Sequence, residues 1–382
     1  MFLKYLFMNE NEKEKNKNLG FELNQGIGSG KYSVLKTFHH PQKLSSFLEK
    51  KVTAPIYVRI KPTNTCPHNC FYCIYRFEFS GIHPESVRTD MIPKEKMFEI
   101  LDDLKAMGIK AVTFSGGGEP LHYPWINEVL KKVLDSKMDF SIITNGQLLH
   151  NEAAELLSQA KWIRVSLDYP DAETFSKIRG VPPTFFDQIK ENIKKFGRMK
   201  NSNCSLGVNC VINEHNYDKV IKIVELCEEL GIDNLRFAPV WKSSYEEYHK
   251  NIKDEALRQI EEARKNSPPG MEIGSTYGRY FDGSTGGSVR AYDRCYYMQI
   301  VPVIAANQNV YACHNSAYDP EARIGSIKDR SFKEMWFSRE TEDFFNNFNP
   351  KKSCQHECSN DEKNKILNEF INCAHPDVVN FI

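Results

Sequence analysis

Short runs of β-branched and aromatic residues alternate with longer amphipathic stretches from about Ala54 to Asn266. This alternation is typical of repeated βα units. Six runs predict strands, over residues 56–62, 111–115, 140–144, 162–168, 205–212 and 235–240. The stretches between them predict helices over residues 94–107, 125–136, 152–159, 185–199 and 217–230. For the last helix, Asn216 predicts the N-cap and Gly231 the end.

This order of elements predicts parallel strands with right-handed crossovers, in an open doubly wound sheet or in a full or partial barrel. In both architectures the chemistry collects at the carboxyl ends of the strands. Polar and glycine-rich segments follow four of the predicted strands: "PTNTC", "SGGGEP", "TNGQ" and "SLDYPD". We therefore expect the functional site in these loops.

The pattern changes near residue 280, at the segment "GRYFDGSTGGS". Beyond it come short predicted strands, isolated cysteines and a predicted helix near Ser331–Trp336. We predict three parts: an N-terminal tail and helical lead-in over residues 1–53, a barrel domain over residues 54–280, and a small cysteine-rich domain over residues 281–382.

Charge and composition exclude several classes of function. Lys plus Arg and Asp plus Glu both number 50, and no basic run is present, so we expect no nucleic-acid partner. The first residues carry no cleavage site for export, and no segment has the roughly 18 apolar residues of a membrane span. Eleven cysteines without an export sequence indicate metal ligands or buried thiols in a reducing cytoplasm.

Three of these cysteines, Cys66, Cys70 and Cys73, follow the first predicted strand with three and then two residues between them. Thiolates select zinc or iron–sulfur clusters. Structural zinc requires four ligands, usually in two separated pairs, so three thiols leave one position open. A four-iron cluster held by three thiolates has one open iron, which can bind a substrate or cofactor.

The segment "CPHNCFYC", with Tyr72 directly before the third cysteine, resembles the CX3CX2C motif of the radical S-adenosylmethionine (SAM) enzymes. The resemblance implies an α/β fold, a partial (β/α)6 barrel, and a [4Fe-4S] cluster on Cys66, Cys70 and Cys73. It also implies that SAM chelates the fourth iron and is cleaved to a 5′-deoxyadenosyl radical, which takes hydrogen from the substrate.

The loops after the later strands match the places where members of this family contact SAM. "FSGGGEP" is similar to the family's GGE motif, at Gly117, Gly118 and Glu119. The resemblance also implies SAM contacts at the following residues: Tyr72, Asn145, Ser166, Asp168 and Arg179. Taken singly, Asn-Gly and Asp-Tyr-Pro are also ordinary turn sequences, and Arg179 can equally be a solvated arginine at a helix end.

A second set of cysteines lies in the last quarter of the chain: Cys295, Cys313, Cys354, Cys358 and Cys373. Their spacing alone also permits zinc, with His356 as a further ligand. The segments "CYYMQIVPVIAANQNVYACHNS" and "RIGSIKDRSFKEMW" resemble the SPASM or twitch extension of radical SAM enzymes. Gln308 stands where relatives carry a hairpin glycine, and the adjacent asparagines are expected to preserve the turn.

The single CX3C pair implies one auxiliary [4Fe-4S] cluster on Cys295, Cys313, Cys354 and Cys358, with Cys373 as a rival for either of the last two positions. Of the remaining cysteines, we expect Cys204, Cys210 and Cys227 to be buried. Cys210 is the only barrel thiol that could return hydrogen to a substrate in an epimerisation.

These features predict a radical SAM enzyme that oxidises or dehydrogenates its substrate with the auxiliary cluster as electron relay, or epimerises it. About 50 residues precede the first strand, which favours a small polar substrate, such as a sugar, aminocyclitol or nucleotide-linked sugar, over a ribosomal peptide. The electron donor would be a reducing partner such as flavodoxin or ferredoxin. A non-catalytic iron–sulfur or zinc protein is the remaining alternative, and no general base can be chosen from the sequence.

Overall fold

One sheet of ten strands organises the computed structural model, which describes residues 33–81, 83–241, 245–278, 281, 290–354 and 358–373. The spatial order of the strands is β10-β9-β8-β1-β2-β3-β4-β5-β6-β7. The strands are β1 (Tyr57–Ile60), β2 (Ala111–Phe114), β3 (Asp139–Thr144), β4 (Trp162–Ser166), β5 (Ser205–Ile212), β6 (Asn234–Pro239), β7 (Glu272–Ser275), β8 (Val303–Ile304), β9 (Asn309–Tyr311) and β10 (Arg323–Ser326). Strands β1 to β7 pair in parallel, as the βα order predicts.

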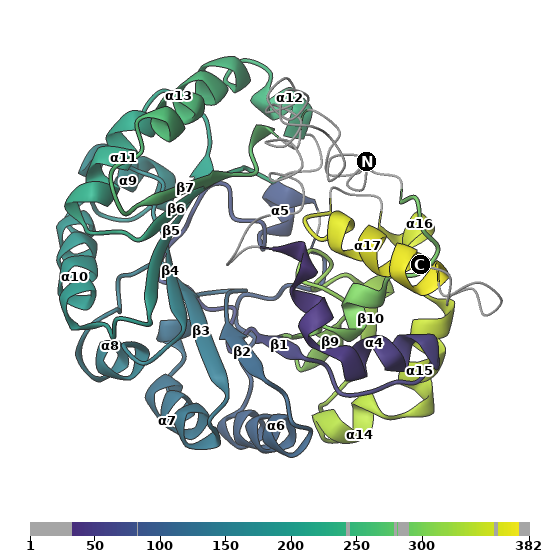
Figure 1. Cartoon of the computed structure of the whole chain (residues 1–382). Coiled ribbons are helices and arrows are strands. Elements are labelled where there is room, and N and C mark those ends of the chain that lie inside the picture. The colour runs from purple at the N-terminus through teal and green to yellow at the C-terminus, as the bar shows by residue number, and fades with distance from the viewer. Residues whose placement is uncertain are drawn as a thin grey trace.

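Helices cover the convex side of this curved sheet (Figure 1). They are α6 (Lys94–Ala106), α7 (Ile126–Ser136), α8 (Asn151–Leu157), α10 (Phe185–Met199), α11 (Val220–Glu229) and α13 (Lys253–Lys265), with α9 (Ala172–Arg179) near the carboxyl ends of the strands. Shorter helices lie in the connections: α5 (Phe77–Ser80), the 3-10 helix η3 (Pro120–His122) and α12 (Tyr245–His249). The protein is thus an α/β protein with a largely parallel sheet, which confirms the expected fold class.

The strands present two different faces. Alternate residues such as Val58, Ile60 and Val165 are fully buried and belong to the main hydrophobic core, under the outer helices. The residues between them lie on the opposite, concave side, called here the inner face. There Tyr57 donates to Thr113, 2.7 Å away, across neighbouring strands. The apolar face fixes the register, and the inner face is left to polar side chains.

Up to β7, the sheet has seven parallel strands, where the sequence predicted six over the same part of the chain. Strand β7 follows "NSPPG" and contains a single large apolar residue, Ile273. It pairs in parallel with β6, with Arg236 opposite Gly274. Because the strand is short and none of its residues is fully buried, its hydrophobic pattern is too weak to indicate a strand.

The predicted start of α11 was wrong, whereas its predicted end is confirmed. The helix begins at Val220 with Lys219 as its cap. Asn216 instead donates through Nδ2 to the carbonyl of Asp168, 2.7 Å away, and so joins the loop after β5 to the loop after β4. Gly231 follows the helix with φ of +68°, a conformation that favours glycine.

The C-terminal part continues the sheet of the barrel. Strand β8 pairs with β1 in parallel, and β8, β9 and β10 form an antiparallel unit. Around it lie the 3-10 helices η5 (Tyr296–Gln299) and η6 (Pro320–Ala322) and the helices α14 (Phe332–Trp336), α15 (Arg339–Asn347), α16 (Pro350–Ser353) and α17 (Asp361–Asn372). The proposed boundary near residue 280 stays a prediction, since hydrogen bonds of one sheet join the two parts.

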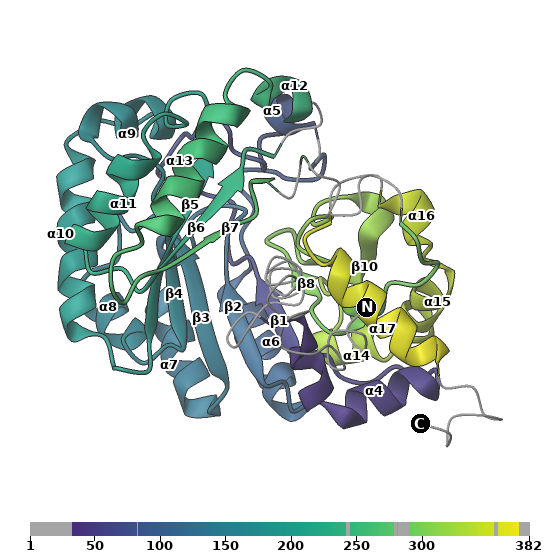
Figure 2. The same ribbon diagram turned by 45° about the horizontal axis from the view of Figure 1, so that its top comes forward.

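The N-terminal lead-in is helical, as predicted, with the 3-10 helix η2 (Val34–His39) followed by α4 (Pro41–Leu48). Figure 2 shows α4 beside the C-terminal helices. Leu44 and Phe47 share a small apolar core with Tyr296 and Leu367. The lead-in therefore packs against the C-terminal part, to which it contributes one side of a core.

The hairpin between β8 and β9 forms as expected, although a different residue carries the turn. Gln308 itself has φ of +62°, and its amide donates to the carbonyl of Ala305, 2.9 Å away. The prediction that the adjacent asparagines would take this conformation was wrong. Asn307 instead accepts a hydrogen bond from the amide of Asn309 at 3.2 Å, which stabilises the turn from its side chain.

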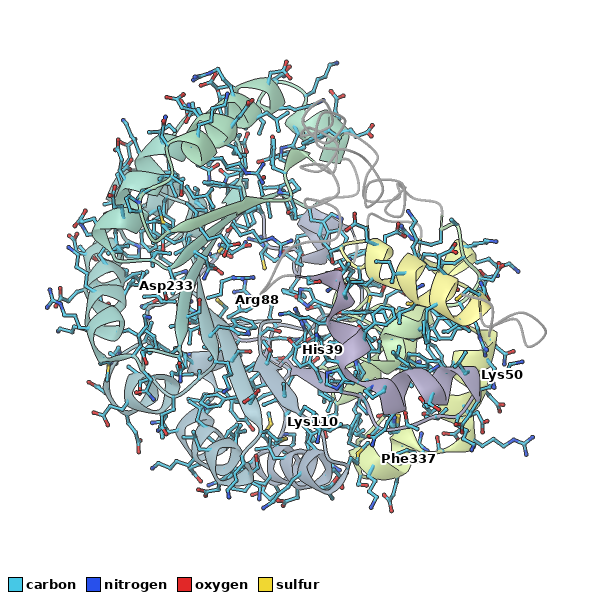
Figure 3. All side chains as sticks on the ribbon, in the orientation of Figure 1. His39, Lys50, Arg88, Lys110, Asp233 and Phe337 are labelled. Atoms are coloured by element: carbon cyan, nitrogen blue, oxygen red, sulfur yellow. The ribbon has the colours of Figure 1, made fainter. Side chains whose placement is uncertain are left out.

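Two neighbouring aromatic residues, the last residue of α14 and the one that follows it, test the packing of the C-terminal part. Trp336 is fully buried and donates through Nε1 to the carbonyl of Thr53, 3.0 Å away, whereas Phe337 is 48% exposed. Figure 3 shows Phe337 at the edge of the molecule. We predict that Trp336→Ala lowers the free energy of unfolding by about 3–5 kcal/mol, because it removes a large buried side chain.

The control, Phe337→Ala, should change that free energy by less than about 0.5 kcal/mol. Anaerobic urea unfolding followed by circular dichroism measures both variants. Equal effects of the two substitutions would contradict this account of the packing.

Candidate active site

The segment from Cys66 to Cys73, called here the three-cysteine loop, follows β1 and rests on the end of α9. The amide of Asn69 donates to the carbonyl of Arg179 at 2.8 Å, and the amide of Phe71 donates to the carbonyl of Ile178 at 3.3 Å. Gly180 ends α9 with φ of +62°, and a Cβ there would press against the backbone of Asn69. The loop therefore takes its position from the helix terminus.

A buried ion pair supports this loop from the barrel side. Arg179 is 4% exposed and Asp168 is fully buried, and the guanidinium of Arg179 binds the carboxylate of Asp168. The same guanidinium donates through Nη1 to Cys70 Sγ at 3.3 Å and through Nη2 to the carbonyl of Ser166 at 2.6 Å. The hydroxyl of Tyr72 donates to the other carboxylate oxygen of Asp168. Arg179 is thus an enclosed cation beside a cysteine, not a solvated residue.

The three thiols suit a soft metal centre. Burial and the charge of Glu119 raise the pKa of Cys66 to about 12, and burial and the charge of Cys70 raise that of Cys73 to about 11. The thiols of Cys66 and Cys73 in the metal-free protein therefore stay protonated at neutral pH, and a bound cation is required to stabilise their thiolates. Arg179 places a cation beside the sulfur of Cys70.

The glycine loop after β2 lies against the segment before the three-cysteine loop. The amide of Gly118 donates to the carbonyl of Thr63, and that of Glu119 to the carbonyl of Thr65, both at 2.9 Å. A Cβ on Gly117 would overlap the side chain of Asn64, and one on Gly118 would overlap the backbone of Thr65. Only glycine permits this approach, which brings the two loops together.

Glu119 positions the loop after β3. Its buried carboxylate accepts hydrogen bonds from the hydroxyl of Thr144 and from the amides of Asn145 and Leu121, at 2.7, 2.7 and 3.0 Å. Burial raises its pKa, and these hydrogen bonds oppose the rise. The Nδ2 of Asn145 is buried without a hydrogen-bond partner in the described residues. An unsatisfied donor at this point is a place where a ligand can bind.

The structure thus brings together every residue predicted to contact SAM, around the three-cysteine loop. Ser166 ends β4 and is half-buried. Asp168, predicted to contact SAM directly, has both carboxylate oxygens bonded to Arg179 and Tyr72. In this structure it supports the cysteine loop, and Asn145 is better placed to bind a ligand.

Sequence reasoning missed several residues that hold these loops. The hydroxyl oxygen of Thr63 accepts a hydrogen bond from the amide of Thr65 at 3.0 Å. Asn64 donates through Nδ2 to the carbonyl of Val87 at 2.9 Å. His68, inside the three-cysteine loop, is 2.9 Å from the side chain of Gln147 after β3. The positions of these residues at strand ends were visible in the sequence, but the side-chain partners of Asn64 and His68 are 23 and 79 residues away along the chain.

The C-terminal cysteines come together from three segments. Burial raises the pKa of Cys295 well above its usual value, and the charges of Cys354, Cys358 and Cys313 raise it further, so these four thiols are neighbours. They are called here the auxiliary set. Cys373 is exposed and its thiol lies 3.2 Å from the carbonyl of Phe370. His356 lies outside the described residues.

No three His, Cys, Asp or Glu side chains in the described part of the chain are arranged to hold a single metal ion. All-sulfur donor sets of this kind suit iron–sulfur clusters.

A block of four residues joins the two cysteine sites, and is called here the linking block: Lys61, Tyr75, His83 and Tyr318. Lys61 is fully buried at the end of β1 and donates to Tyr75, two residues beyond Cys73. Its ammonium group lies 4.2 Å from the Tyr75 ring centre and 5.8 Å from that of Tyr318. The Tyr75 and His83 rings stack at 5.1 Å. The block places residues close to both thiol sets in one packed unit.

The other predicted thiol, Cys210, lies in the main core. It is fully buried on the helix-facing side of β5, and its pKa is raised by burial and by the charges of Asp168 and Cys227. Cys204 and Cys227 are buried as expected. Because Cys210 points away from the inner face, its placement gives no support to a role as hydrogen donor.

Two family models match this chain. The first, described as the radical SAM superfamily, covers residues 60–227, and the second, an iron-sulfur cluster-binding domain named SPASM, covers residues 295–359. Together they span more than half of the 382 residues. The chain belongs to the radical SAM superfamily and carries a SPASM domain. The radical SAM domain implies SAM and a [4Fe-4S] cluster as cofactors, and the SPASM domain implies auxiliary iron–sulfur clusters.

Individual curated relatives match only part of this chain. The chain is 27% identical over 180 residues to the AdoMet-dependent heme synthase of Methanosarcina barkeri, covering 47% of this chain and 48% of that protein. It is 30% identical over 213 residues to the probable GTP 3',8-cyclase of Saccharolobus islandicus, covering 54% of this chain and 63% of that protein. The chain thus matches about half to three-fifths of the length of these curated relatives.

Among solved structures, Streptococcus suis SuiB bound to precursor peptide SuiA superposes with a TM-score of 0.61 at 18% identity, over 91% of this chain and 83% of that one. The structure of anSMEcpe with bound AdoMet superposes with a TM-score of 0.55 at 18% identity, over 85% of this chain and 98% of that one. At these identities the likeness shows the fold alone. No helix in the described residues is long and apolar enough to cross a membrane.

The contact between the glycine loop and Asn64 is tested by Gly117→Ala. The added methyl group overlaps the Asn64 side chain, so the glycine loop must move away. We predict at least a tenfold loss of SAM affinity in the reconstituted protein, measured by equilibrium dialysis. Gly274→Ala is the control, because a Cβ there meets nothing within 4 Å and should leave SAM affinity unchanged. Equal affinities in all three proteins would contradict the assigned SAM site.

The buried ion pair is tested by Arg179→Gln, which leaves the carboxylate of Asp168 without its cation. We predict a loss of about 3 kcal/mol in the free energy of unfolding, measured by urea unfolding. Combining it with Asp168→Asn should cost less than the sum of the two single changes, since the uncompensated charge is removed.

On the same helix, Lys177 forms an exposed pair with Glu173, so Lys177→Gln should cost less than about 1 kcal/mol. Additive effects of the Arg179 and Asp168 substitutions would show that the pair is not coupled and would contradict this account.

Proposed function

We propose that this enzyme oxidises or dehydrogenates a small polar substrate, such as a sugar, an aminocyclitol or a nucleotide-linked sugar. The first cluster, on Cys66, Cys70 and Cys73, and SAM supply a 5′-deoxyadenosyl radical when bound, and one auxiliary [4Fe-4S] cluster supplies an acceptor for the electron released from the substrate.

The protein's own residues would position the cluster and SAM. The three-cysteine loop rests on α9, Arg179 donates a hydrogen bond to Cys70, and the buried donor of Asn145 has no partner in the described residues and can bind SAM. Glu119 holds the loop of Asn145 in place.

The observation that carries the proposal is the linking block. Tyr318 lies five residues after Cys313, and its hydroxyl donates to Asn64, two residues before Cys66. Tyr75 packs against the small core that contains Tyr311 and Tyr318. If the substrate binds between the two cysteine sites, electron transfer from it to the auxiliary cluster requires a packed connection between these sites. A protein that holds clusters for stability alone does not need such a connection.

The inner face supports a polar substrate. Its strand positions include Thr113, Ser141, Asn209 and several basic residues, whereas most of the apolar residues of the same strands face the helices. The curated relatives are also named for small molecules, a heme and GTP. Epimerisation is less well supported, because Cys210 is on the other side of β5. A reducing partner such as flavodoxin or ferredoxin in the cytoplasm would supply the electron.

The proposal predicts two separable iron sites. The protein reconstituted anaerobically with iron and sulfide should hold about eight irons per chain, and the Cys66/Cys70/Cys73→Ala variant about four. With dithionite and SAM, only the wild type should form 5′-deoxyadenosine. Cys358→Ala should lose the irons of the auxiliary cluster, whereas Cys373→Ala should keep both sets of irons, because the thiol of Cys373 is exposed.

Zinc in place of iron, or iron without SAM cleavage, would overturn the proposal. Hydrogen transfer from a peptide, and from none of a panel of sugars, aminocyclitols and nucleotide sugars, would favour a peptide maturase. Deuterium transfer from labelled substrate into 5′-deoxyadenosine is the measurement.

A further inference from the structure

One residue of the C-terminal part reaches the loops that we assign to SAM. The hydroxyl of Tyr318 donates to Oδ1 of Asn64, two residues before Cys66. Tyr318 follows β9 and lies 254 residues further along the chain, and both side chains are buried. The C-terminal part therefore does more than carry the auxiliary set, because it also contributes a hydrogen bond to the segment before the three-cysteine loop.

Asn64 connects Tyr318 to the glycine loop. Its Nδ2 donates to the carbonyl of Val87, so the hydrogen bond from Tyr318 fixes the remaining polar atom of the side chain, Oδ1. A Cβ built on Gly117 would lie 1.6 Å from that Oδ1 and 2.9 Å from the hydroxyl oxygen of Tyr318. Gly117 therefore packs against both partners of this hydrogen bond.

Tyr318 has a backbone conformation that is unusual for its residue type. Its φ is +68°, in the left-handed region that bulky side chains rarely adopt. Among the described residues, the other non-glycine positions with positive φ are exposed or half-buried: Lys50, Lys137, Asn151 and Gln308. Tyr318 is fully buried. A strained residue persists where its surroundings over-determine it, and such residues cluster at functional sites.

Contacts with both parts of the chain hold Tyr318 in this conformation. Its carbonyl accepts a hydrogen bond from the amide of Glu85, in the barrel part, at 3.1 Å. The centre of its ring lies 5.7 Å from that of Tyr311 and 6.0 Å from that of Tyr75. The side chain is therefore fixed at its backbone and at its ring, and the hydroxyl is left to bond Asn64.

A phenylalanine would fill the same space in the aromatic packing, so the hydroxyl and the strained backbone point to a role beyond packing. We propose that Tyr318 is a positioning residue for SAM, which acts through Asn64 to fix the glycine loop in the position that binds the cofactor. The SAM site is then incomplete without the C-terminal part. This inference concerns the cofactor and goes beyond the proposed substrate chemistry, so its failure would leave that proposal standing.

Tyr318→Phe tests the inference, because it keeps the ring and removes only the hydroxyl. The buried Oδ1 of Asn64 then lacks its donor, so the side chain can turn and release the glycine loop. In the anaerobically reconstituted protein we expect SAM affinity, measured by equilibrium dialysis, to fall at least fivefold at unchanged iron content. The matched control is Tyr277→Phe, a fully buried tyrosine whose hydroxyl lies 3.0 Å from Nδ1 of His249, and it should bind SAM as the wild type does.

A double-mutant cycle shows whether Tyr318 acts through Asn64. Asn64→Ala should also weaken SAM binding, and it removes the acceptor of the same hydrogen bond. The combined variant should therefore bind SAM no more weakly than Asn64→Ala alone. Multiplying losses in the combined variant, or unchanged affinity in Tyr318→Phe, would overturn the inference.

Electron paramagnetic resonance of the reduced first cluster separates positioning from general support of the fold. Without SAM, the spectrum of Tyr318→Phe should equal that of the wild type, and only the SAM concentration that changes it should rise. A spectrum that is altered before SAM is added, or a loss of iron or of circular dichroism signal, would assign Tyr318 to the fold as a whole and would also refute the positioning role.

A role of Tyr318 in electron transfer alone gives a different result. Tyr318→Phe would then bind SAM with wild-type affinity and form 5′-deoxyadenosine normally, and only oxidation of the substrate would slow. That outcome supports the proposed function and overturns this inference. A fivefold weaker affinity for SAM together with wild-type affinity in Tyr277→Phe supports the inference, whatever the substrate is.

Discussion

Arg179 and Asp168 form an ion pair with both side chains almost fully enclosed, and three elements of the site meet at it. Asp168 follows β4, Arg179 ends α9, and Tyr72 and Cys70 belong to the three-cysteine loop. A buried pair of this kind adds little to stability by itself, since the loss of hydration offsets the attraction. Its value here lies in specificity, because any other arrangement of the three elements leaves a charge buried without its partner. Asn216 adds the loop after β5 through the carbonyl of Asp168.

The second constraint is the pairing of β8 with β1. It makes the C-terminal cysteines part of the same sheet that carries the three-cysteine loop, so the two thiol sites are positioned by backbone hydrogen bonds and not by a flexible linker. Trp336 extends the connection by bonding the carbonyl of Thr53, just before β1. Electron transfer depends on a fixed separation of donor and acceptor, and a continuous sheet supplies it.

The sequence predicted the parallel core, the three-cysteine loop and the strand-end loops, because all of these depend on local patterns. The hydrophobic alternation of β1 to β6 and the spacing of Cys66, Cys70 and Cys73 can be read within a few residues. Strand β7 could not be predicted, because its one large apolar residue, Ile273, makes no pattern. Nor could the roles of Asn216 and Lys61, whose side chains bond partners up to 55 residues away. The membership of the auxiliary set likewise depends on tertiary packing, which leaves the thiol of Cys373 exposed and the other four partly buried.

Lysine and arginine on the inner face respond differently to burial. Burial lowers the pKa of Lys61 far below its usual value, and the nearby charge of Arg59 lowers it further. Lys61 is enclosed by Tyr75, Tyr318 and the carbonyl of Gly116, and it donates hydrogen bonds to Tyr75 and to that carbonyl. A guanidinium does not lose its proton in a protein, so Arg59 stays charged. Lys61 therefore acts through its contacts in the linking block, where it joins the two cysteine sites.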